Sequence, residues 1–348
     1  MNSDSESTGA KRSSKLRRIL HWVMIIGLSS VCGVLVLASA GAAYQWIAHN
    51  RDLRQNPRPG QLVDVGAYRM HLYCFGQGSP TVVFDSGLGD TWLAWHKVQP
   101  PIAQFTRVCS YDRAGLGWSD PSPHPRTSSV IAEELHTLLH NAGIAGPFVL
   151  VGHSLGGMNV RMFAVLFRPE VAGIVLVDST HPDQQRRLPQ ELQRSNAEFL
   201  RKQGLKADSM TFGIPRLMGW CGNGPPEIRE MLRTVECRLG PWREHLAEGE
   251  SFDESADEVR AAGSLGNIPL AVLSHDPEKL YVATDLAKQM NQQWDEMQGE
   301  LAQLSTDSSR AIAKGSGHYI QVDRPDLVIA VVRKLVEQPR NSVATVRQ

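Results

Sequence analysis

One serine in this chain has the surroundings of a nucleophile. Residues 152–157 read Gly-His-Ser-Leu-Gly-Gly, so Ser154 has a glycine two positions away on either side. The apolar run 146–151 before it is typical of a buried strand, and the residues after it are typical of a helix. Strand, G-x-S-x-G and helix together indicate a nucleophile elbow, in which Gly152 and Gly156 make room for a sharp turn. We therefore expect Ser154 to attack an electrophilic carbon; the alternative is a glycine-rich turn that only closes a parallel sheet.

Strand-like and helical stretches alternate around this elbow. Besides the elbow strand, we expect a hairpin and five further strands, at 63–65 with 68–75, 80–84, 105–111, 173–178, 268–273 and 310–314. Helices are predicted over 129–142 and 326–336. This alternation favours a mostly parallel α/β sheet with crossover helices. It stops between residues 181 and 267, which are polar and rich in helical patterns.

Four motifs, in this order, resemble those of the α/β-hydrolase superfamily. They are Asp-Ser-Gly-Leu-Gly at 85–89, Tyr-Asp-Arg-Ala-Gly-Leu-Gly-Trp-Ser-Asp at 111–120, the Ser154 elbow and Gly-Ser-Gly-His at 315–318. The resemblance implies an eight-stranded, mostly parallel sheet flanked by helices, with a helical cap inserted after the sixth strand. The expected divisions are a core over 61–180 and 268–338, a cap over 181–267 and a tail over 339–348.

A serine hydroxyl needs a base to remove its proton. Among the 12 histidines, His318 follows the last expected strand in the Gly-Ser-Gly-His loop. This resembles the place where the family carries its catalytic histidine. His153 adjoins the nucleophile, but we expect its side chain to point elsewhere. His124, His181 and His275 are weaker candidates in loops.

The acid that orients the histidine has two candidates. The commonest family arrangement puts it after strand seven in a Gly-x-x-Asp turn, where this chain has Asp276 without the glycine and at short spacing. The other arrangement puts it at the end of strand six, where Asp178 stands 24 residues after Ser154. We favour Asp178 and keep Asp276 as the alternative acid. The structural alternative for Asp178 is a carboxylate that ties down a loop. The structural alternative for Asp276 is an Asp-Pro turn.

Two backbone donors are expected to stabilise the oxyanion that forms on attack. One is the N–H of Leu155, directly after the nucleophile. The resemblance implies that the other lies in the loop after the third strand, where many relatives carry His-Gly and this chain has Ser-Gly-Leu at 86–88. We expect the N–H of Leu88 to be this donor. Because the His-Gly pair is absent, the sequence does not predict which hydrogen bonds hold the loop in place.

Nucleotide, metal and nucleic-acid chemistry are not predicted. The glycine-rich segment 112–120 is followed by neither GxxxxGK[ST] nor GxGxxG, and in the family it is mainly structural. No histidine or cysteine spacing is typical of a metal site. The 36 basic and 36 acidic residues leave no net charge that would favour nucleic acid. We expect no cofactor.

The N-terminal region predicts a membrane anchor. Residues 20–50 contain no Lys, Arg, Asp or Glu, and residues 22–44 alone are long enough to cross a hydrocarbon core of about 30 Å. Basic residues before this stretch place the N-terminus in the cytoplasm. The expected segments are a basic cytoplasmic tail over 1–18, a transmembrane signal anchor over 19–47 and a linker over 48–60, with the catalytic domain across the membrane. The Ala-Ser-Ala run at 38–40 allows the alternative of a cleaved signal and a secreted protein.

The five cysteines are compatible with export. Cys32 falls in the membrane segment, Cys74 and Cys109 fall in expected strands, and Cys221 and Cys237 fall 16 residues apart in the cap. Either of the last two pairs can bridge in an oxidising compartment, with buried free thiols as the alternative.

The cap also carries an apolar cluster whose spacing is partly helical. Its members are Met210, Phe212, Ile214, Leu217, Met218 and Trp220. Core packing is the favoured interpretation; a wall of the substrate site, which would favour acyl or other apolar groups, is the alternative.

These features predict a membrane-anchored serine hydrolase that acts on a small-molecule ester through an acyl-enzyme. Amidase, thioesterase, carbon–carbon hydrolase and haloperoxidase-like reactions share the same motifs, because a fold does not fix a reaction. The alternative from another class is a non-catalytic binding or receptor protein. It is disfavoured because the elbow glycines and the triad candidates are all present.

Overall fold

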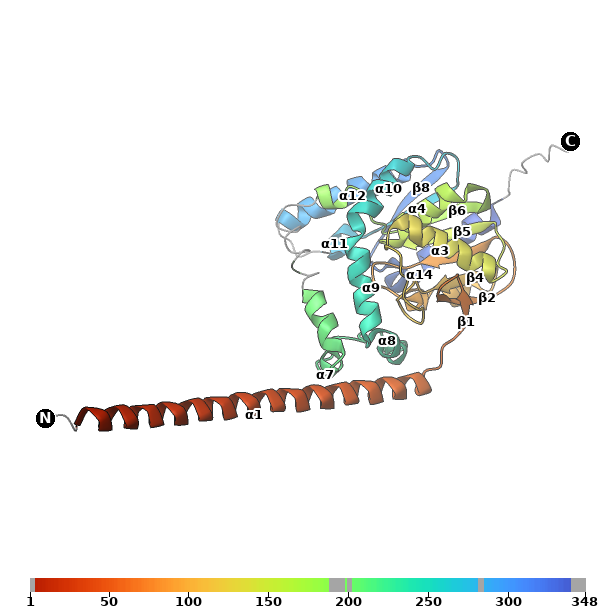
Figure 1. Ribbon diagram of the computed structural model, residues 1–348. Helices are drawn as coiled ribbons and strands as arrows, with labels where there is room; N and C mark the ends of the chain where they lie inside the picture. Colours follow the sequence, from red (N-terminus) through yellow and green to blue (C-terminus); the bar gives the residue numbers. More distant parts are fainter. Residues whose placement is uncertain (1–3, 188–197, 199–201, 281–284, 339–348) are drawn as a thin grey trace.

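A twisted eight-stranded sheet forms the centre of the computed structural model, which describes residues 4–187, 198, 202–280 and 285–338 (Figure 1). The strands are β1 Gln61–Asp64, β2 Arg69–Phe75, β3 Thr81–Asp85, β4 Val108–Tyr111, β5 Phe148–His153, β6 Val171–Val177, β7 Leu270–His275 and β8 Ser308–Ala313. Their order is β1-β2-β4-β3-β5-β6-β7-β8. β1, β2 and β4 pair antiparallel, and every later pairing is parallel. The predicted fold class is confirmed, whereas the expected tail 339–348 lies outside the described residues.

Helices cover both faces of the sheet, which explains why its central strands are apolar along their whole length. The helices that flank it are α2 Gln99–Ile102, α3 Ser128–Asn141, α4 Gly156–Leu166, α12 Asp285–Ala302, α13 Ile320–Asp323 and α14 Pro325–Glu337. One core layer lies between the sheet and α3, α4 and α12; the other lies between the sheet and α2, α13 and α14. Short turns η1 Trp92–Trp95, η2 Arg168–Glu170 and α11 Pro277–Leu280 complete the core.

The long connection from β6 to β7 is helical, as expected for a cap. Its labelled helices are α5 Gln184–Arg187, α7 Ile214–Leu217, α8 Arg229–Glu236, α9 Leu239–Glu250 and α10 Phe252–Ala262, and residues 202–210 are helical as well. α10 returns to pack on α3 and α4. Of the apolar cluster, Met210 is fully buried, but Phe212, Ile214, Leu217, Met218 and Trp220 are 40% to 66% exposed. Core packing therefore accounts for only one of the six.

The N-terminal helix α1 Asp4–Gln55 extends away from the sheet (Figure 1). Within residues 17–55, the most apolar 18-residue window has a mean hydropathy of 2.3 and is not buried against the rest of the chain. By length and composition, this part of the helix could cross a membrane. The helix continues through residues 48–55 of the expected linker and ends before the prolines at 57 and 59, which interrupt helical hydrogen bonding. Ala48 and Asp52 are buried in this stretch, so packing accounts for its order.

Two disulfides join segments that are distant in the sequence. Cys74 and Cys109 occupy paired positions of the neighbouring strands β2 and β4. Cys221 and Cys237 link the segment after α7 to the end of α8. Cys32 is a free, exposed thiol on α1.

Candidate active site

The turn between β5 and α4 places Ser154 in a left-handed backbone conformation with φ of 51°. This sharp turn brings the backbone on either side of Ser154 very close to neighbouring backbone atoms. A Cβ on Gly152 would lie 2.4 Å from the carbonyl oxygen of Gly156, and one on Gly156 would lie 2.3 Å from the carbonyl oxygen of Asp85. Both glycines are therefore needed for the turn, and the elbow packs directly against the end of β3.

The structure brings Asp178 and His318 together. Asp178 directly follows β6 and has a φ of 43°, and its Oδ2 lies 2.6 Å from Nδ1 of His318. His318 lies in the loop between β8 and α13. The acid is fully buried, while about a third of the histidine side chain is exposed. The carboxylate therefore sits behind the imidazole, with the opposite ring edge accessible.

Asp178 accepts hydrogen bonds from three further groups. The backbone N–H of His275 lies 3.0 Å from Oδ1, Nδ1 of His275 lies 2.9 Å from both oxygens, and Nε1 of Trp294 lies 2.9 Å from Oδ1. Burial acts to raise the pKa of Asp178, but the hydrogen bonds from His275 and His318 outweigh it and hold that pKa well below its usual value. Asp178 is therefore ionised.

The same pairing lowers the pKa of Asp178 but raises that of the base, His318. Burial acts to lower the pKa of His318, but the hydrogen bond and the negative charge of Asp178 raise it above the usual 6.5. The imidazole can therefore accept a proton and hold the resulting charge.

His275 and Trp294 are site residues that the sequence did not indicate clearly. His275, a weak candidate for the base, ends β7 next to β6, so its backbone and ring reach the acid. Its position at the carboxyl end of a central parallel strand was the available signal. Trp294 comes from α12, and nothing in its local sequence relates it to Asp178.

Asp276 lies nearby but hydrogen-bonds to the backbone of Gly315 and Ser316 rather than to the imidazole of His318. Its Oδ2 accepts from the N–H of Gly315 at 2.8 Å and its Oδ1 from the N–H of Glu278 at 3.1 Å. Its backbone N–H donates to the carbonyl of Ser316 at 3.0 Å. These bonds tie the end of β7 to the loop that carries His318.

His153 contacts the base instead of the nucleophile. Its Nε2 lies 3.0 Å from the carbonyl oxygen of His318, and its ring packs against the rings of His318 and Tyr319 with centroid separations of 4.6 and 4.9 Å. Burial, together with the charge of His318, lowers the pKa of His153 to about 3. A neutral His153 therefore donates to the backbone of His318 and helps to position it.

Arg113 supplies the hydrogen bonding of the loop after β3. Its guanidinium donates to the carbonyl of Ser86 at 2.7 Å and to that of Gly87 at 2.6 Å. In a planar trans peptide the C=O and the next N–H point in opposite directions, so the N–H of Leu88 points away from Arg113. Among the hydrogen bonds of the described residues, none is donated by the N–H of Leu88 or of Leu155.

The same guanidinium joins the core to the cap. It pairs with Asp85 of β3 at 2.7 Å and makes two bonds to Glu248 of α9, at 2.5 and 2.9 Å. Burial opposes the charge on Arg113, but the two carboxylates raise its pKa and keep it cationic. The 111–120 motif therefore positions the loop beside the elbow.

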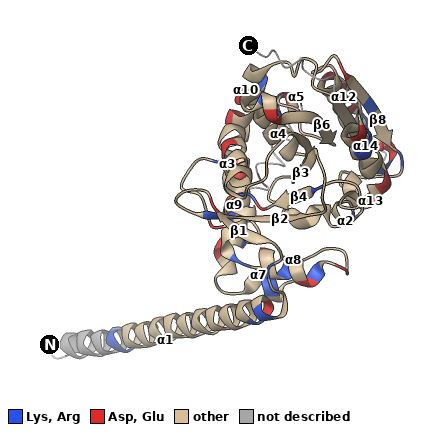
Figure 2. Ribbon diagram, turned by 90° about the vertical axis from the view of Figure 1, so that its right-hand side faces the viewer, with Lys and Arg blue, Asp and Glu red and all other residues tan. Residues whose placement is uncertain are grey.

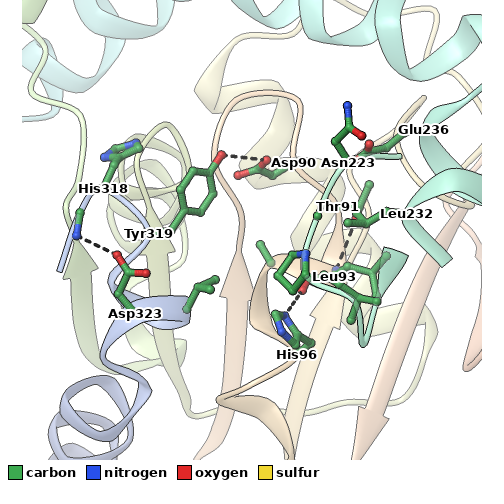
Figure 3. Close-up of a pocket in the computed structure, with 16 residues that line it drawn as sticks. Asp90, Thr91, Leu93, His96, Asn223, Leu232, Glu236, His318, Tyr319 and Asp323 are labelled. Atoms are coloured by element: carbon green, nitrogen blue, oxygen red, sulfur yellow. Dashed lines mark hydrogen bonds between the residues drawn. The ribbon is translucent and has the colours of Figure 1, made fainter. Parts of the chain in front are cut away.

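A cavity of about 530 Å³ opens between the cap and the loop that carries His318 (Figure 3). His318, Tyr319 and Asp90 lie on one side of it, and Leu232 and Glu236 of α8 lie on the other. Ser154 is not among its lining residues, so the cavity meets the site on the histidine side.

Two carboxyl groups make one part of this cavity acidic. Burial raises the pKa of Asp90 to about 6 and that of Glu236 to about 7. The Tyr319 hydroxyl donates to Asp90 at 3.3 Å. Within the part of the chain that the structure describes, no group of three or more His, Cys, Asp or Glu side chains is placed to hold a metal ion.

Comparison with known proteins agrees with this architecture. The sequence model of the alpha/beta hydrolase family matches residues 82–331. The chain is 25% identical over 313 residues to a probable transporter, efuK, of Hormonema carpetanum; the match covers 82% of this chain and 44% of that protein, so the chain spans less than half of that relative.

Two solved structures share the fold. The Cif epoxide hydrolase from Acinetobacter nosocomialis has a TM-score of 0.65 at 16% identity, covering 85% of this chain and 96% of that one. A thermophilic esterase from Thermogutta terrifontis has a TM-score of 0.55 at 22% identity, covering 80% and 97%. Because the family model matches most of the chain, from β3 to α14, the chain belongs to the alpha/beta hydrolase family.

Proposed function

We propose that this protein is a membrane-anchored serine hydrolase that cleaves carboxylic esters through an acyl-enzyme. The observation that carries the proposal is the strained Ser154 elbow together with the His318–Asp178 pair, in which Nδ1 of His318 lies 2.6 Å from Oδ2 of Asp178. A serine at such a turn, a histidine open to a cavity and a buried ionised acid behind it are the parts that nucleophilic acyl transfer needs.

In this mechanism His318 takes the proton of the Ser154 hydroxyl as the oxygen attacks the ester carbonyl. Asp178 stabilises the imidazolium and holds its tautomer, since its carboxylate faces Nδ1. The N–H groups of Leu155 and Leu88 are the proposed donors to the oxyanion. His318 then gives the proton to the leaving alcohol, and water, activated by the same histidine, releases the acid from Ser154.

The position of the cavity indicates which part of the substrate it would hold. The leaving oxygen must lie on the side of the histidine that protonates it, and the cavity is lined by His318 but not by Ser154. We therefore assign the cavity to the alcohol part of the ester.

The identity of the nucleophile favours acyl chemistry over epoxide opening. Attack of a serine oxygen on an epoxide carbon would form an ether, which has no carbonyl for water to attack. The enzyme would then stay alkylated after one turnover. Attack on an ester carbonyl forms a serine ester, which water hydrolyses. The shared fold with an epoxide hydrolase therefore does not extend the proposal to that reaction.

Membrane anchoring is supported by α1, and export of the catalytic domain is supported by the two disulfides. The helical segment from residue 17 to residue 55 contains an apolar stretch that is long enough to span a bilayer. Disulfides persist in oxidising compartments and are rare in the cytosol.

Hydrolysis of p-nitrophenyl esters of increasing acyl length tests the proposal. The full chain in detergent is compared with Ser154→Ala and with Ser179→Ala, a matched serine that follows Asp178. Turnover by the parent and by Ser179→Ala, with a loss of several orders of magnitude in Ser154→Ala, is expected. Equal and undetectable turnover by all three folded proteins would contradict it and favour a binding role.

A further inference from the structure

Five large apolar side chains form an exposed surface on the cap, which we call the cap ridge. The cap ridge consists of Phe212, Ile214, Leu217, Met218 and Trp220. They are 40% to 66% exposed within nine residues of sequence, although the cap has a buried cluster beside them that takes in Met210 and the Cys221–Cys237 disulfide. Large apolar side chains that are exposed so close together in the sequence indicate a contact with a membrane or another molecule.

The segment that carries the cap ridge, with α7 at its centre, lies beside α1 (Figure 1). A Cβ on Gly41 would lie 2.5 Å from the carbonyl oxygen of Phe212. A Cβ on Gly213 would lie 2.9 Å from the ring of Tyr44 and 3.4 Å from Gln45. The start of α7 therefore sits level with residues 41–45 of α1.

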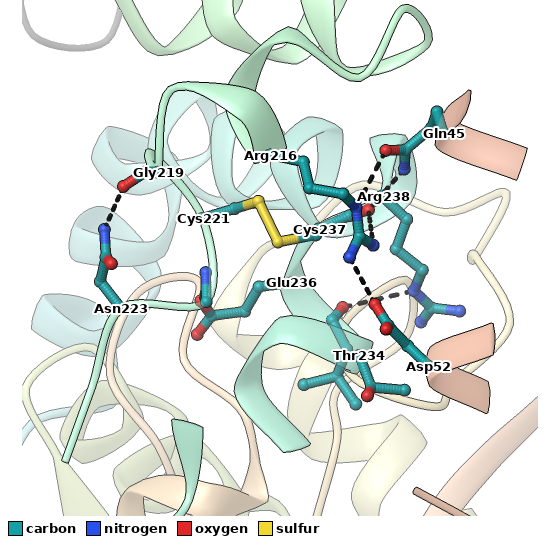
Figure 4. The surroundings of a disulfide bond; sticks show 12 residues. Gln45, Asp52, Arg216, Gly219, Cys221, Asn223, Thr234, Glu236, Cys237 and Arg238 are labelled. Carbon is teal, nitrogen blue, oxygen red and sulfur yellow. Dashed lines mark hydrogen bonds and ion pairs between the residues drawn. A yellow bond between two sulfur atoms is a disulfide. The ribbon is translucent and has the colours of Figure 1, made fainter. Parts of the chain in front are cut away.

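Buried polar contacts fix this arrangement (Figure 4). Arg216, inside the α7 sequence but turned away from solvent, forms an ion pair with Asp52 and a bond of 3.2 Å to Oε1 of Gln45. Nε2 of Gln45 donates to the carbonyl of Cys237 at 2.6 Å, next to the disulfide. These contacts fix which face of α1 is turned toward the cap and where along the helix axis the cap is attached.

The length of the apolar part of α1 gives the depth of that contact. Residues 19–47 are 29 residues without Lys, Arg, Asp or Glu. As a helix they extend about 43 Å. A hydrocarbon core of about 30 Å takes about 20 residues. Counted from Ile19, directly after Arg17 and Arg18, the core ends near residue 38, which leaves residues 39–47 at the lipid–water boundary before Arg51.

The charge distribution agrees with this depth. Figure 2 shows α1 without charged residues between its two basic ends, and at the end nearest the sheet the charges resume at Arg51. Tyr44 and Trp46 are exposed just before that end. Tyr and Trp concentrate at membrane–water boundaries. Residues 41–45, and with them the start of the cap ridge, are at this level.

We infer that the cap ridge is a membrane-contact surface that lies in the headgroup and upper acyl region of the same bilayer that α1 spans. The occupant of this surface is lipid, since α1 brings the bilayer to it. The inference rests on the proposed membrane anchoring and adds to it a second point of attachment. This second contact would fix the orientation of the cap, and hence of the cavity that Asn223 of the cap helps to line, relative to the membrane.

Depth-dependent quenching in vesicles tests this inference on the full chain. In a Cys32→Ser background, one position at a time is changed to cysteine and labelled with an environment-sensitive fluorophore: Met218→Cys and Leu217→Cys on the cap ridge, Leu28→Cys in the middle of α1, and Asp257→Cys on α10. Met218, Leu28 and Asp257 are similarly exposed, at 60% to 65%. The protein is reconstituted in phosphatidylcholine vesicles that carry a nitroxide at acyl carbon 5 or at acyl carbon 12.

The expected result is strong quenching of both ridge labels by the carbon-5 nitroxide, stronger quenching of the Leu28 label by the carbon-12 nitroxide, and no quenching of the Asp257 label. If the Leu28 label is quenched and both ridge labels are not, the cap ridge is out of the lipid and the inference is overturned while the anchor stands. Ridge labels that are shielded from water but unquenched would mean that protein, such as a second copy, covers the surface, which also overturns it. An unquenched Leu28 label would instead overturn the anchor.

Discussion

At the scale of single residues, the candidate site depends on one carboxylate that is shared between two histidines. Asp178 faces His318 at 2.6 Å and His275 at 2.9 Å. Of these two histidines His318 lines the cavity, whereas His275 does not and its side chain is only 4% exposed. We therefore assign proton transfer to His318 and treat His275 as a positioning residue that holds the acid.

Replacement of the acid should separate the two aspartate candidates. Asp178→Asn removes the charge that stabilises the imidazolium and offers the wrong hydrogen-bonding partner, so kcat for ester hydrolysis should fall by roughly 10³- to 10⁴-fold. Asp276→Asn keeps an acceptor for the N–H of Gly315 and should retain most of the activity. Steady-state kinetics of the two variants checks this, and a larger loss in Asp276→Asn would reverse the assignment of the acid.

The pH dependence of the reaction should report the same pairing. His318 is active as a base only when neutral, and its pKa is raised above 6.5, so kcat/KM should fall as the pH drops through a midpoint above 6.5. Weakening the contact with the carboxylate lowers that pKa, so in Asp178→Asn the residual activity should have its midpoint at lower pH. A pH–rate profile of both proteins tests this; an unchanged midpoint would mean that Asp178 does not set the pKa of the base.

At the scale of elements, the sequence predicted the parts of the site that lie on regular periodic segments. The strand before Ser154 and the helix after it are confirmed because a buried parallel strand reads as a continuous apolar run and the elbow needs its glycines. Contacts made by distant segments could not be predicted in the same way. Trp294 on α12 and Glu248 on α9 reach the site only through tertiary packing.

The helical state of residues 48–55 was missed for the same reason. This stretch is polar and precedes two prolines, which is typical of a linker, but Ala48 and Asp52 are buried and Asp52 pairs with Arg216 of α7. The cap ridge was likewise expected to be core, because apolar residues at helical spacing do not reveal whether protein or lipid covers them.

The junction of β3, the 111–120 loop and α9 should be sensitive to loss of Arg113. Arg113→Met leaves Asp85 and Glu248 as buried carboxylates without their cation, at a cost of about 3–5 kcal/mol in the free energy of unfolding. Arg69→Met, which breaks the exposed pair with Asp120, should cost at most about 1 kcal/mol. Thermal unfolding followed by circular dichroism compares the two, and equal melting temperatures would contradict the structural role of Arg113.

At the scale of the whole molecule, the anchor, the disulfides and the catalytic core predict one orientation. The basic residues in the first part of α1, before its apolar stretch, favour a cytoplasmic N-terminus, so the sheet and cap should lie on the other side, where both disulfides can form. Buried contacts join the cap to α1, so in the proposed anchored state they would hold the hydrolase domain close to the bilayer surface rather than on a free tether.

Protease accessibility tests this orientation in intact bacterial spheroplasts that express the full chain with an N-terminal epitope. External protease should degrade the hydrolase domain and leave the epitope protected until the membrane is permeabilised. A cytoplasmic protein that folds with its thiols reduced serves as the control for leakage. Protection of the hydrolase domain in sealed spheroplasts would show the opposite topology and contradict export.

The central claim is that Ser154 is an activated nucleophile, and reaction with a fluorophosphonate tests it most directly. Such a probe phosphonylates a serine that a neighbouring base activates, without requiring the natural substrate. We predict a single adduct on Ser154 in the folded full chain, found by mass spectrometry of its peptide, and its loss in His318→Ala. A folded protein whose Ser154 stays unmodified, or is modified equally in His318→Ala, would contradict the account.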